Sequence, residues 1–267
     1  MKGMGQFNPE YYLLHRPFYP PQAFAGFAAS LRARGFKEPF ELADIGCGTG
    51  HSTASILQAG VLARVLGVEP DPGMLEAAQG LVRSLGLSES VRFSPGSGEA
   101  SGLAGTSVDG VLVGSAFHWM DPVSARSEFV RILRPRGIVH LFEYQFPKAI
   151  RLQELNDWIR RQFNLHWKAP GQVPRGDFGQ VTAAFKDHPA FEKCGEGRPP
   201  MVQELTAGEL SGLLLSQSRL LHFESTLPES EKSGFRDRTR AEVDARWGNT
   251  RESFDFRLAW IRFAKRE

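Results

Sequence analysis

Closely spaced glycines that follow a carboxylate are the first residues in this chain whose types and spacing could do chemistry. Gly46, Gly48 and Gly50 follow an apolar segment in the stretch ELADIGCGTGHSTASIL, residues 41–57, and Asp44 precedes them. A near absence of side chains where a strand meets a helix indicates that a large group approaches the backbone there. In a doubly wound fold this junction is the ligand position, outside the carboxyl end of the first strand.

A second acidic residue strengthens this interpretation. Glu69 ends the apolar segment ARVLGVE and lies 19 residues beyond Gly50. Taken alone, a glutamate after a strand is commonly a solvated loop residue. An acidic residue at this spacing from a glycine loop can instead accept both hydroxyls of a ribose. Together the two features predict a ligand that contains adenosine.

The order of the glycines discriminates between two such ligands. A dinucleotide fingerprint reads GxGxxG, and its third glycine lets the helix N-terminus point at a pyrophosphate. Here the order is GxGxG, and position 51 is His. Asp44 would repel a pyrophosphate but suits a ligand that carries an ammonium or a sulfonium group. S-adenosylmethionine carries both and has no phosphate, so the residues favour it over a nicotinamide dinucleotide.

The elements that must position these residues alternate between strand and helix. Predicted strands are FELADI, ARVLGVE, VRFS, SVDGVLVGS and IVHLFEY, with helices over residues 49–59, 71–86 and 121–133. Asp71 and Asp121, each followed by proline, are typical helix starts. This alternation predicts an α/β fold with a doubly wound, mostly parallel sheet. At the end of the chain SFDFRLAWIRFAK, residues 253–265, alternates with period two and predicts a half-buried strand at the sheet edge.

The chain divides by composition into four segments: 1–38, an arm and a helix; 39–147, a ligand-binding core; 148–205, an inserted cap rich in Pro and Gly; and 206–267, which completes the core sheet. Of its 267 residues 41% are hydrophobic and 23% are charged, with a net charge of +2. This is ordinary globular usage, and it indicates no polyanionic partner. Two cysteines and the absence of an apolar leader or a long apolar stretch predict a soluble, cytoplasmic protein.

Several motifs resemble one protein family. LADIGCGTGHST and GVEPDPGMLEAA resemble the first two motifs of class I S-adenosylmethionine-dependent methyltransferases. SVDGVLVGSAFHWMDPVSARSEFVRILRPRG resembles the fourth strand through the fifth helix of their type 11 group. SAFHWMD at 115–121 and HRPFYP at 15–20 resemble the trans-aconitate methyltransferase-like branch. The resemblance implies a Rossmann-like methyltransferase fold with a seven-stranded sheet and an inserted, mainly helical cap.

The resemblance also implies which residues hold the cofactor. Gly46, Cys47 and Gly48 would offer backbone to its methionine part and ribose, and Glu69 would take the ribose hydroxyls. Pro70 would flank the adenine, with Ser97, Gly98 and Glu99 near the adenine amine. Many relatives carry Asp where Ser97 stands, so this contact would run through main chain. Ser115, at the end of the fourth strand, stands where relatives often carry Gln.

The acceptor side is predicted from four further residues, each with an alternative interpretation. His118 could be a general base or a structural residue, and Trp119 could line a substrate pocket or fill the core. Tyr12 and Arg16 could close over the cofactor, with Arg16 on its carboxylate, or could belong to a surface arm. Cys47 lacks a paired His motif and is interpreted as a packing residue, and no ligand spacing suggests a metal site.

These observations predict a methyltransferase that moves a methyl group from S-adenosylmethionine to a small-molecule acceptor, a carboxylate or a hydroxyl, and releases S-adenosylhomocysteine. A carboxylate acceptor is ionised at neutral pH and needs no base. The alternatives are a non-catalytic S-adenosylmethionine-binding module and a nicotinamide-dependent oxidoreductase. The sequence has no basic stripe of the kind that binds nucleic acid, so no nucleic-acid partner is expected. No membrane partner is expected either, and the protein would be a monomer or a homodimer.

Overall fold

The computed structural model describes residues 8–167, 183–186, 188–247 and 250–267. They divide into two compact units, each described by itself. The core unit takes its residues from 17–144, 175–199 and 258–267, and the helical unit from 1–16, 145–174 and 200–257. The segment predicted as 206–267 is therefore shared, because only its last residues join the core unit.

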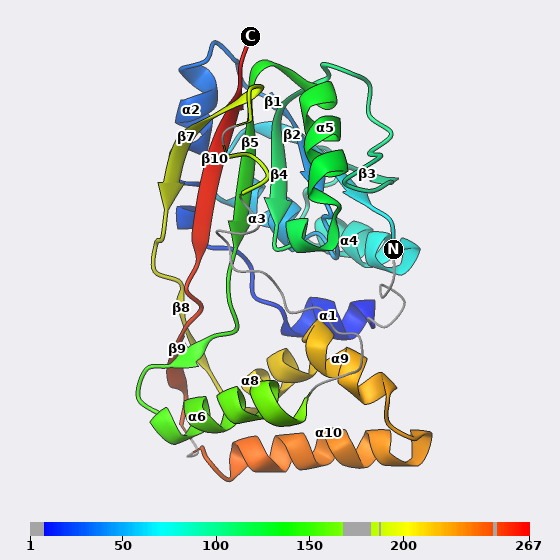
Figure 1. The fold of residues 1–267 in the computed structure, drawn as a ribbon, viewed down its shortest axis with the longest axis vertical. Helices are drawn as coiled ribbons and strands as arrows, with labels where there is room; N and C mark the ends of the chain where they lie inside the picture. The colour runs from blue at the N-terminus through cyan, green and yellow to red at the C-terminus, as the bar shows by residue number, and fades with distance from the viewer. Residues whose placement is uncertain (1–7, 168–182, 187, 248–249) are drawn as a thin grey trace. The chain divides into compact units, whose positions relative to one another are not determined.

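The core unit is built on a seven-stranded sheet of order β3-β2-β1-β4-β5-β10-β7 (Figure 1). Its strands are β1 (Phe40–Ile45), β2 (Ala63–Glu69), β3 (Val91–Pro95), β4 (Val108–Gly114), β5 (Leu133–Glu143), β7 (Phe191–Gly197) and β10 (Ala259–Lys265). Strands β1 to β5 run parallel to one another. Strand β10 is antiparallel to β5 and β7. The predicted mostly parallel sheet is confirmed.

The helices of the core unit are η1 (Pro21–Phe24), α2 (Phe27–Arg32), α3 (His51–Gln58), α4 (Pro72–Ser84), η2 (Phe117–Trp119) and α5 (Pro122–Ile132). Two of them begin as the Asp-Pro pairs predict. The side chain of Asp71 accepts the N–H of Met74 at 3.0 Å, and that of Asp121 accepts the N–H of Ser124 at 2.8 Å. Each aspartate thus satisfies one of the unpaired donors at its helix start.

The helical unit contains α1 (Pro9–His15), α6 (Gln153–Arg161), the π-helix η3 (Gln162–His166), α8 (Ala207–Leu215), α9 (Ser218–Ser225) and α10 (Glu229–Asp244). A small antiparallel sheet of order β6-β9-β8 belongs to it. Its strands are β6 (Lys148–Ala149), β8 (Val202–Leu205) and β9 (Glu252–Asp255).

Two strands differ from the sequence-based prediction. The single strand predicted over 253–265 is wrong: β9 and β10 are separate, with Arg257 between them at φ +49°. Period-two alternation continues through the break, so the pattern hides it. Strand β10 also lies inside the sheet, because β7 pairs beyond it at the edge. The sequence does not predict strand β7 within the cap, since this edge strand has one buried residue among exposed and half-buried ones and therefore carries no apolar alternation.

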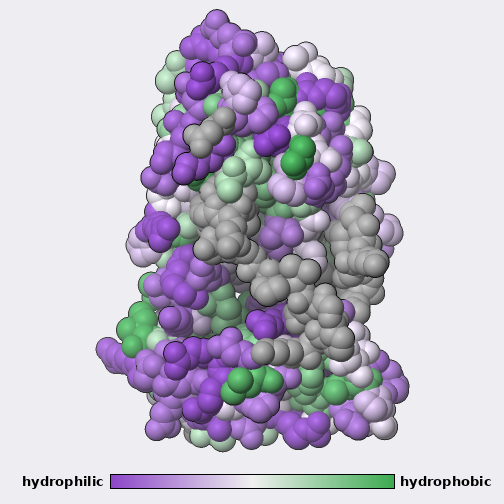
Figure 2. All heavy atoms as spheres, viewed as in Figure 1, coloured by the Kyte–Doolittle hydropathy of each residue, from purple (hydrophilic) through white to green (hydrophobic). Residues whose placement is uncertain are grey.

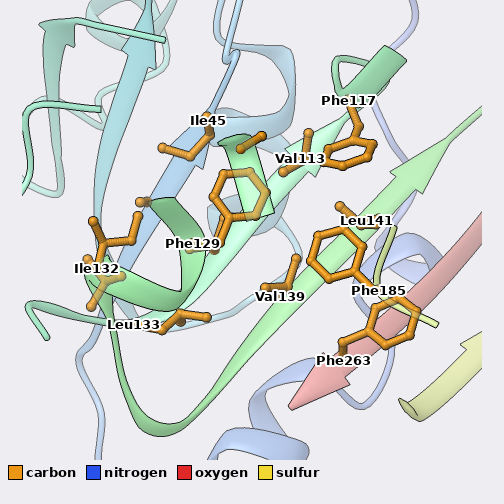
Figure 3. Packing of buried hydrophobic residues seen from close by; sticks show 14 of the residues in the cluster. Ile45, Val113, Phe117, Phe129, Ile132, Leu133, Val139, Leu141, Phe185 and Phe263 are labelled. Atoms are coloured by element: carbon orange, nitrogen blue, oxygen red, sulfur yellow. The ribbon is translucent and has the colours of Figure 1, made fainter. Parts of the chain in front are cut away.

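Helix α5 packs its apolar side on the sheet of the core unit. Phe129 is completely buried there, next to Ile132 and Val139 (Figure 3). Its ring lies 6.3 Å from those of Phe117 and Phe185. This cluster continues to the end of β4, so it supports the turn that carries His118 and Trp119.

The surface of the described residues is mostly polar. On the face drawn in Figure 2, hydrophilic residues predominate and hydrophobic ones gather only in small groups. Within the described ranges, no helix has both the length and the apolar character needed to cross a membrane.

The core cluster predicts the cost of removing its central ring. Phe129→Ala should lower the free energy of unfolding by about 3–5 kcal/mol, because it leaves a cavity that the packed strands cannot close. Urea denaturation followed by circular dichroism measures this change. Leu62→Ala, at a side chain that is 62% exposed, is the matched control and should change stability by about 0.5 kcal/mol or less. A loss at Phe129 as small as the control's would contradict the packing described here.

Candidate functional site

The glycine loop joins β1 to α3, and its backbone demands glycine. Gly46, Gly48 and Gly50 have φ values of +71°, +54° and +83°, which other residues rarely adopt. Two of the three are also crowded. A Cβ on Gly46 would lie 2.7 Å from the Cβ of Ala116, and one on Gly50 would lie 3.2 Å from that of Ala78. The loop therefore packs closely against the end of β4 and against α4.

Glu69 holds this loop from the end of β2. It is buried, and its Oε2 accepts the N–H of Gly48 at 3.0 Å while Oε1 accepts that of Asp71 at 3.2 Å. Burial raises the pKa of Glu69, and the nearby carboxylates of Asp71 and Asp44 raise it further. The two hydrogen bonds lower it, but by less than burial raises it. A carboxylate has about four acceptor positions. Glu69 can therefore anchor the loop and still accept the hydroxyls of a ligand.

Asp44, near the end of β1, is fully buried, and its two oxygens differ. Oδ2 accepts the hydroxyls of Ser52 and Thr53, each at 2.6 Å. Oδ1 is buried and has no hydrogen-bond partner among the described residues. Burial raises the pKa of Asp44 to about 6 despite those two hydrogen bonds. An unpaired buried acceptor at the ligand edge of the sheet fits a ligand that donates N–H and carries positive charge.

The main-chain donors of the loop are engaged within the protein. Gly46 and Cys47 both donate their N–H to the carbonyl of Val68, at 2.7 and 3.1 Å. The thiol of Cys47 is buried, and its pKa is raised well above the usual value by burial and by the charges of Asp44 and Glu69. A thiol held in the neutral form supports the interpretation of Cys47 as a packing residue.

The segment predicted to meet the adenine is tied to the turn after β4. Ser97 closes a tight turn by accepting the N–H of Glu99 and Ala100 on its Oγ. Glu99 in turn accepts the N–H of Asp121 at 2.8 Å. Met120 packs on Gly98 so closely that a Cβ there would lie 2.3 Å from its sulfur. Sequence reasoning missed Met120, although it directly follows Trp119 in the SAFHWMD stretch.

The end of β4 brings together three of the predicted site residues. Ser115 has φ +52°, unusual for a residue other than glycine, and its Oγ accepts the hydroxyl of Tyr19 at 2.9 Å. His118 and Trp119 follow in η2 with their rings 5.1 Å apart. Trp119 is 42% exposed, which excludes the core-filling interpretation of its side chain. Phe117 occupies that core position instead.

Tyr12 and Arg16 belong to the helical unit. The guanidinium of Arg16 lies 4.6 Å from the centre of the Tyr12 ring and donates to the carbonyl of Ser216 at 2.9 Å. Ser216 is the C-cap residue of α8, and the helix dipole favours cations at that end of a helix. The closure of these residues over a cofactor stays a prediction.

Pro70, predicted to flank the adenine, directly follows Glu69 and is half-buried.

The part of the chain that the structure describes contains no group of three or more His, Cys, Asp or Glu residues able to hold a metal ion.

The titration of Asp44 gives a stability test. Its folded pKa is about 6 against 3.8 for the ordinary carboxyl, so between these values the folded state binds more protons than the unfolded state. The free energy of unfolding therefore falls as the pH rises through this window. Asp44→Asn removes this titration. Relative to wild type, its free energy of unfolding should therefore rise by about 2 kcal/mol between pH 4.5 and pH 7.5.

Urea denaturation at the two pH values measures this gain. Asp237→Asn, at a side chain that is 74% exposed, is the control and should follow wild type. An Asp44→Asn variant with the pH dependence of wild type would show that Asp44 does not titrate as described.

Comparison with known proteins identifies a methyltransferase domain in part of this chain. Residues 43–141 match the family model of a methyltransferase domain, which spans β1 to β5 and thus Asp44, Glu69 and Ser115. An uncharacterised methyltransferase of Mycobacterium tuberculosis is 36% identical over 122 residues, 46% of this chain and 44% of the relative. A trans-aconitate 2-methyltransferase of an Enterobacter strain is 39% identical over 82 residues, 28% of this chain and 29% of the relative. The chain thus spans less than half the length of these relatives.

Solved structures resemble the chain over a greater length. A protein from Anaeromyxobacter dehalogenans, assigned as a type II methyltransferase, is similar with a TM-score of 0.66 at 19% identity, covering 94% of this chain and 97% of its own. A Galdieria sulphuraria protein, assigned as a sarcosine dimethylglycine methyltransferase, has a TM-score of 0.54 at 15% identity, covering 92% and 85%. These similarities concern the fold. Residues 43–141 are therefore a methyltransferase domain, and with its sheet and its glycine loop the chain resembles the class I S-adenosylmethionine-dependent methyltransferases.

Proposed function

We propose that the protein binds S-adenosylmethionine in the core unit and transfers its methyl group to a small-molecule acceptor. The observation that carries this proposal is the buried, unpaired Oδ1 of Asp44 beside the glycine loop. Its pKa of about 6 leaves the carboxylate ionised at neutral pH, so it can receive a cation. The methionine part of the cofactor ends in an ammonium group, which supplies both the charge and the N–H donors.

The other cofactor contacts follow from the positions around the loop. Glu69 accepts the ribose hydroxyls while it holds Gly48, and Gly46 and Gly48 allow the ligand to approach the backbone. Pro70 flanks the adenine. Ser97, Gly98 and Glu99 lie at the adenine edge, with Cys47 and Ser115 on the methionine side. Because the turn of Ser97 is closed by its own hydroxyl, main-chain groups make the adenine contact.

The cofactor, when bound, supplies a methyl group on a good leaving group. The protein then has to hold the acceptor in line with that methyl and exclude water, which can contribute about 7–11 kcal/mol without a catalytic triad. Trp119, exposed at the turn after β4, offers a flat apolar wall for an acceptor. His118 beside it serves as general base when the acceptor is a hydroxyl, and a carboxylate acceptor needs none.

The helical unit completes the acceptor side in this proposal. Tyr12 and Arg16 close over the cofactor, and the cap supplies the outer wall. A small acid is a reasonable first acceptor to test, because one relative is named a trans-aconitate 2-methyltransferase. We further propose a cytoplasmic protein that acts as a monomer or a homodimer.

Isothermal titration calorimetry tests the proposal directly. The protein should bind S-adenosylmethionine and S-adenosylhomocysteine with much higher affinity than NAD. Equal or tighter binding of NAD would favour the nicotinamide-dependent oxidoreductase. A panel of small carboxylic acids and phenols, assayed with methyl-labelled cofactor, then tests transfer. Tight cofactor binding without transfer to any acceptor would favour a non-catalytic binding module.

Glu69 gives a residue-level test. Glu69→Ala should weaken S-adenosylhomocysteine binding by about 1.5–3 kcal/mol, because a charge-assisted contact with the ribose is lost. Glu41→Ala, which removes an exposed partner of Arg64 from the same sheet, is the matched control and should bind as wild type does. Unchanged affinity in a folded Glu69→Ala variant would place the ribose elsewhere.

Arg16 tests the closure. If its guanidinium pairs with the cofactor carboxylate, Arg16→Ala should raise the dissociation constant for S-adenosylhomocysteine about tenfold, in line with one charge-assisted hydrogen bond. Arg160→Ala, in an exposed ion pair with Asp157 of the same unit, controls for the loss of an arginine. Equal affinities of wild type and Arg16→Ala, measured by calorimetry, would leave Arg16 a purely structural residue of the helical unit.

A further inference from the structure

Tyr19 is a site residue that sequence reasoning did not assign. Its N–H donates to Oγ of Ser55 in α3 at 3.0 Å, and its side chain is buried. Its ring packs edge-on against Phe142 at 4.7 Å and lies 5.3 Å from Tyr144. The backbone and the ring of Tyr19 are thus both held in place, and its hydroxyl donates to Oγ of Ser115 at 2.9 Å.

Ser115 stands where a ligand would meet the end of β4. Its N–H still donates to the carbonyl of Phe142, so it ends the pairing of β4 with β5. It then turns the chain at φ +52°, a conformation that costs free energy and persists only where its surroundings enforce it. The hydrogen bond from Tyr19 is one such constraint. Ala116, the next residue, already touches the glycine loop at Gly46.

The same edge carries the carboxylate of Asp44. Asp44 pairs with Leu112 across the neighbouring strands β1 and β4, which in a sheet lie about 4.8 Å apart. Ser52, which donates to Asp44, lies against Gly114, because a Cβ on Gly114 would be 3.2 Å from that of Ser52. Ser115 therefore directly follows Gly114, which packs against the Ser52 that donates to Asp44.

The two groups have complementary chemistry. The carboxylate of Asp44 accepts hydrogen bonds and attracts a cation. The hydroxyl of Ser115 accepts from Tyr19 and so keeps its own proton for another acceptor. Hydrogen bonds in such a chain strengthen one another. An amino-acid group carries an ammonium and a carboxylate on one carbon, and an acceptor and a donor for them stand at the ends of the neighbouring strands β1 and β4.

We propose that Tyr19 is a positioning residue that fixes Ser115 as the donor to the α-carboxylate of the bound cofactor, opposite the ammonium held by Asp44. This inference rests on the proposed function and adds to it a second contact for the α-carboxylate of the ligand, beside that of Arg16. Tyr19 acts through Ser115.

A comparison of two ligands distinguishes a role of Tyr19 in holding the amino-acid group from a general effect on the site. S-adenosylhomocysteine has the amino-acid group, and 5′-methylthioadenosine lacks it but keeps the adenosine. Tyr19→Phe retains the ring and removes only the hydroxyl. It should raise the dissociation constant of S-adenosylhomocysteine about tenfold in calorimetry, and that of 5′-methylthioadenosine less than about twofold.

Further variants test the coupling. Ser115→Gly relieves the left-handed backbone conformation and removes the hydroxyl, so it should stay folded and lose the same affinity for S-adenosylhomocysteine. The double variant should lose no more than either single variant, because the two residues act as one unit. Tyr11→Phe, the same substitution in α1, should bind both ligands as wild type does.

The outcomes are distinguishable. Equal weakening of both ligands in Tyr19→Phe, additive losses in the double variant, or unchanged binding of S-adenosylhomocysteine would each overturn the role of Tyr19. Failure of the wild-type protein to bind S-adenosylhomocysteine would instead overturn the proposed function, and this inference with it.

Discussion

The site depends on two carboxylates buried side by side at one loop. Asp44 and Glu69 are both almost inaccessible to water, and each raises the pKa of the Cys47 thiol. Among the described residues, no ion pair offsets either charge; hydroxyl groups solvate Asp44, and backbone N–H groups solvate Glu69. Burying charge in this way is unfavourable for the apo protein. The glycine backbone and the packing around the loop hold the two carboxylates in place against this cost. In the proposed function, the positive charge of the cofactor offsets it.

The sequence predicts this part of the molecule well because its signals are local. Glycine order, the Asp-Pro helix starts and the position of Glu69 each act over a few residues, and the strands they belong to are apolar and parallel. Prediction fails where the cause is distant. Strand β7 forms because β10 offers it an edge, and the break at Arg257 lies inside an unbroken alternation. Met120 and Tyr19 reach the site through contacts with Gly98 and Ser115, which no spacing along the chain announces.

A buried polar pair on the sheet explains how the segment with Tyr19 is held. The ring of His140 in β5 meets the carbonyl of Ala23 through Nε2 at 2.9 Å, and its Nδ1 accepts from Arg262 of β10 at 3.3 Å. Burial, reinforced by the charge of Arg262, keeps the pKa of His140 well below its usual value. The neutral ring with its proton on Nε2 satisfies both partners. Arg262 also donates to the carbonyl of Ala25 at 2.6 Å. Two strands that carry none of the predicted site residues therefore fix the backbone beyond Tyr19.

The division of the chain fits a division of tasks. The family match over residues 43–141 takes in the glycine loop, Asp44, Glu69 and the turn after β4, which are the groups that hold the cofactor in the proposed function. The helical unit lies outside that match, and so does the segment with Tyr19. A cofactor common to many enzymes needs the same loop in each of them, whereas an acceptor differs from one enzyme to the next. The cofactor could thus be predicted from residues of the shared domain, whereas in the proposed function the acceptor depends also on Trp119 and on residues outside the family match.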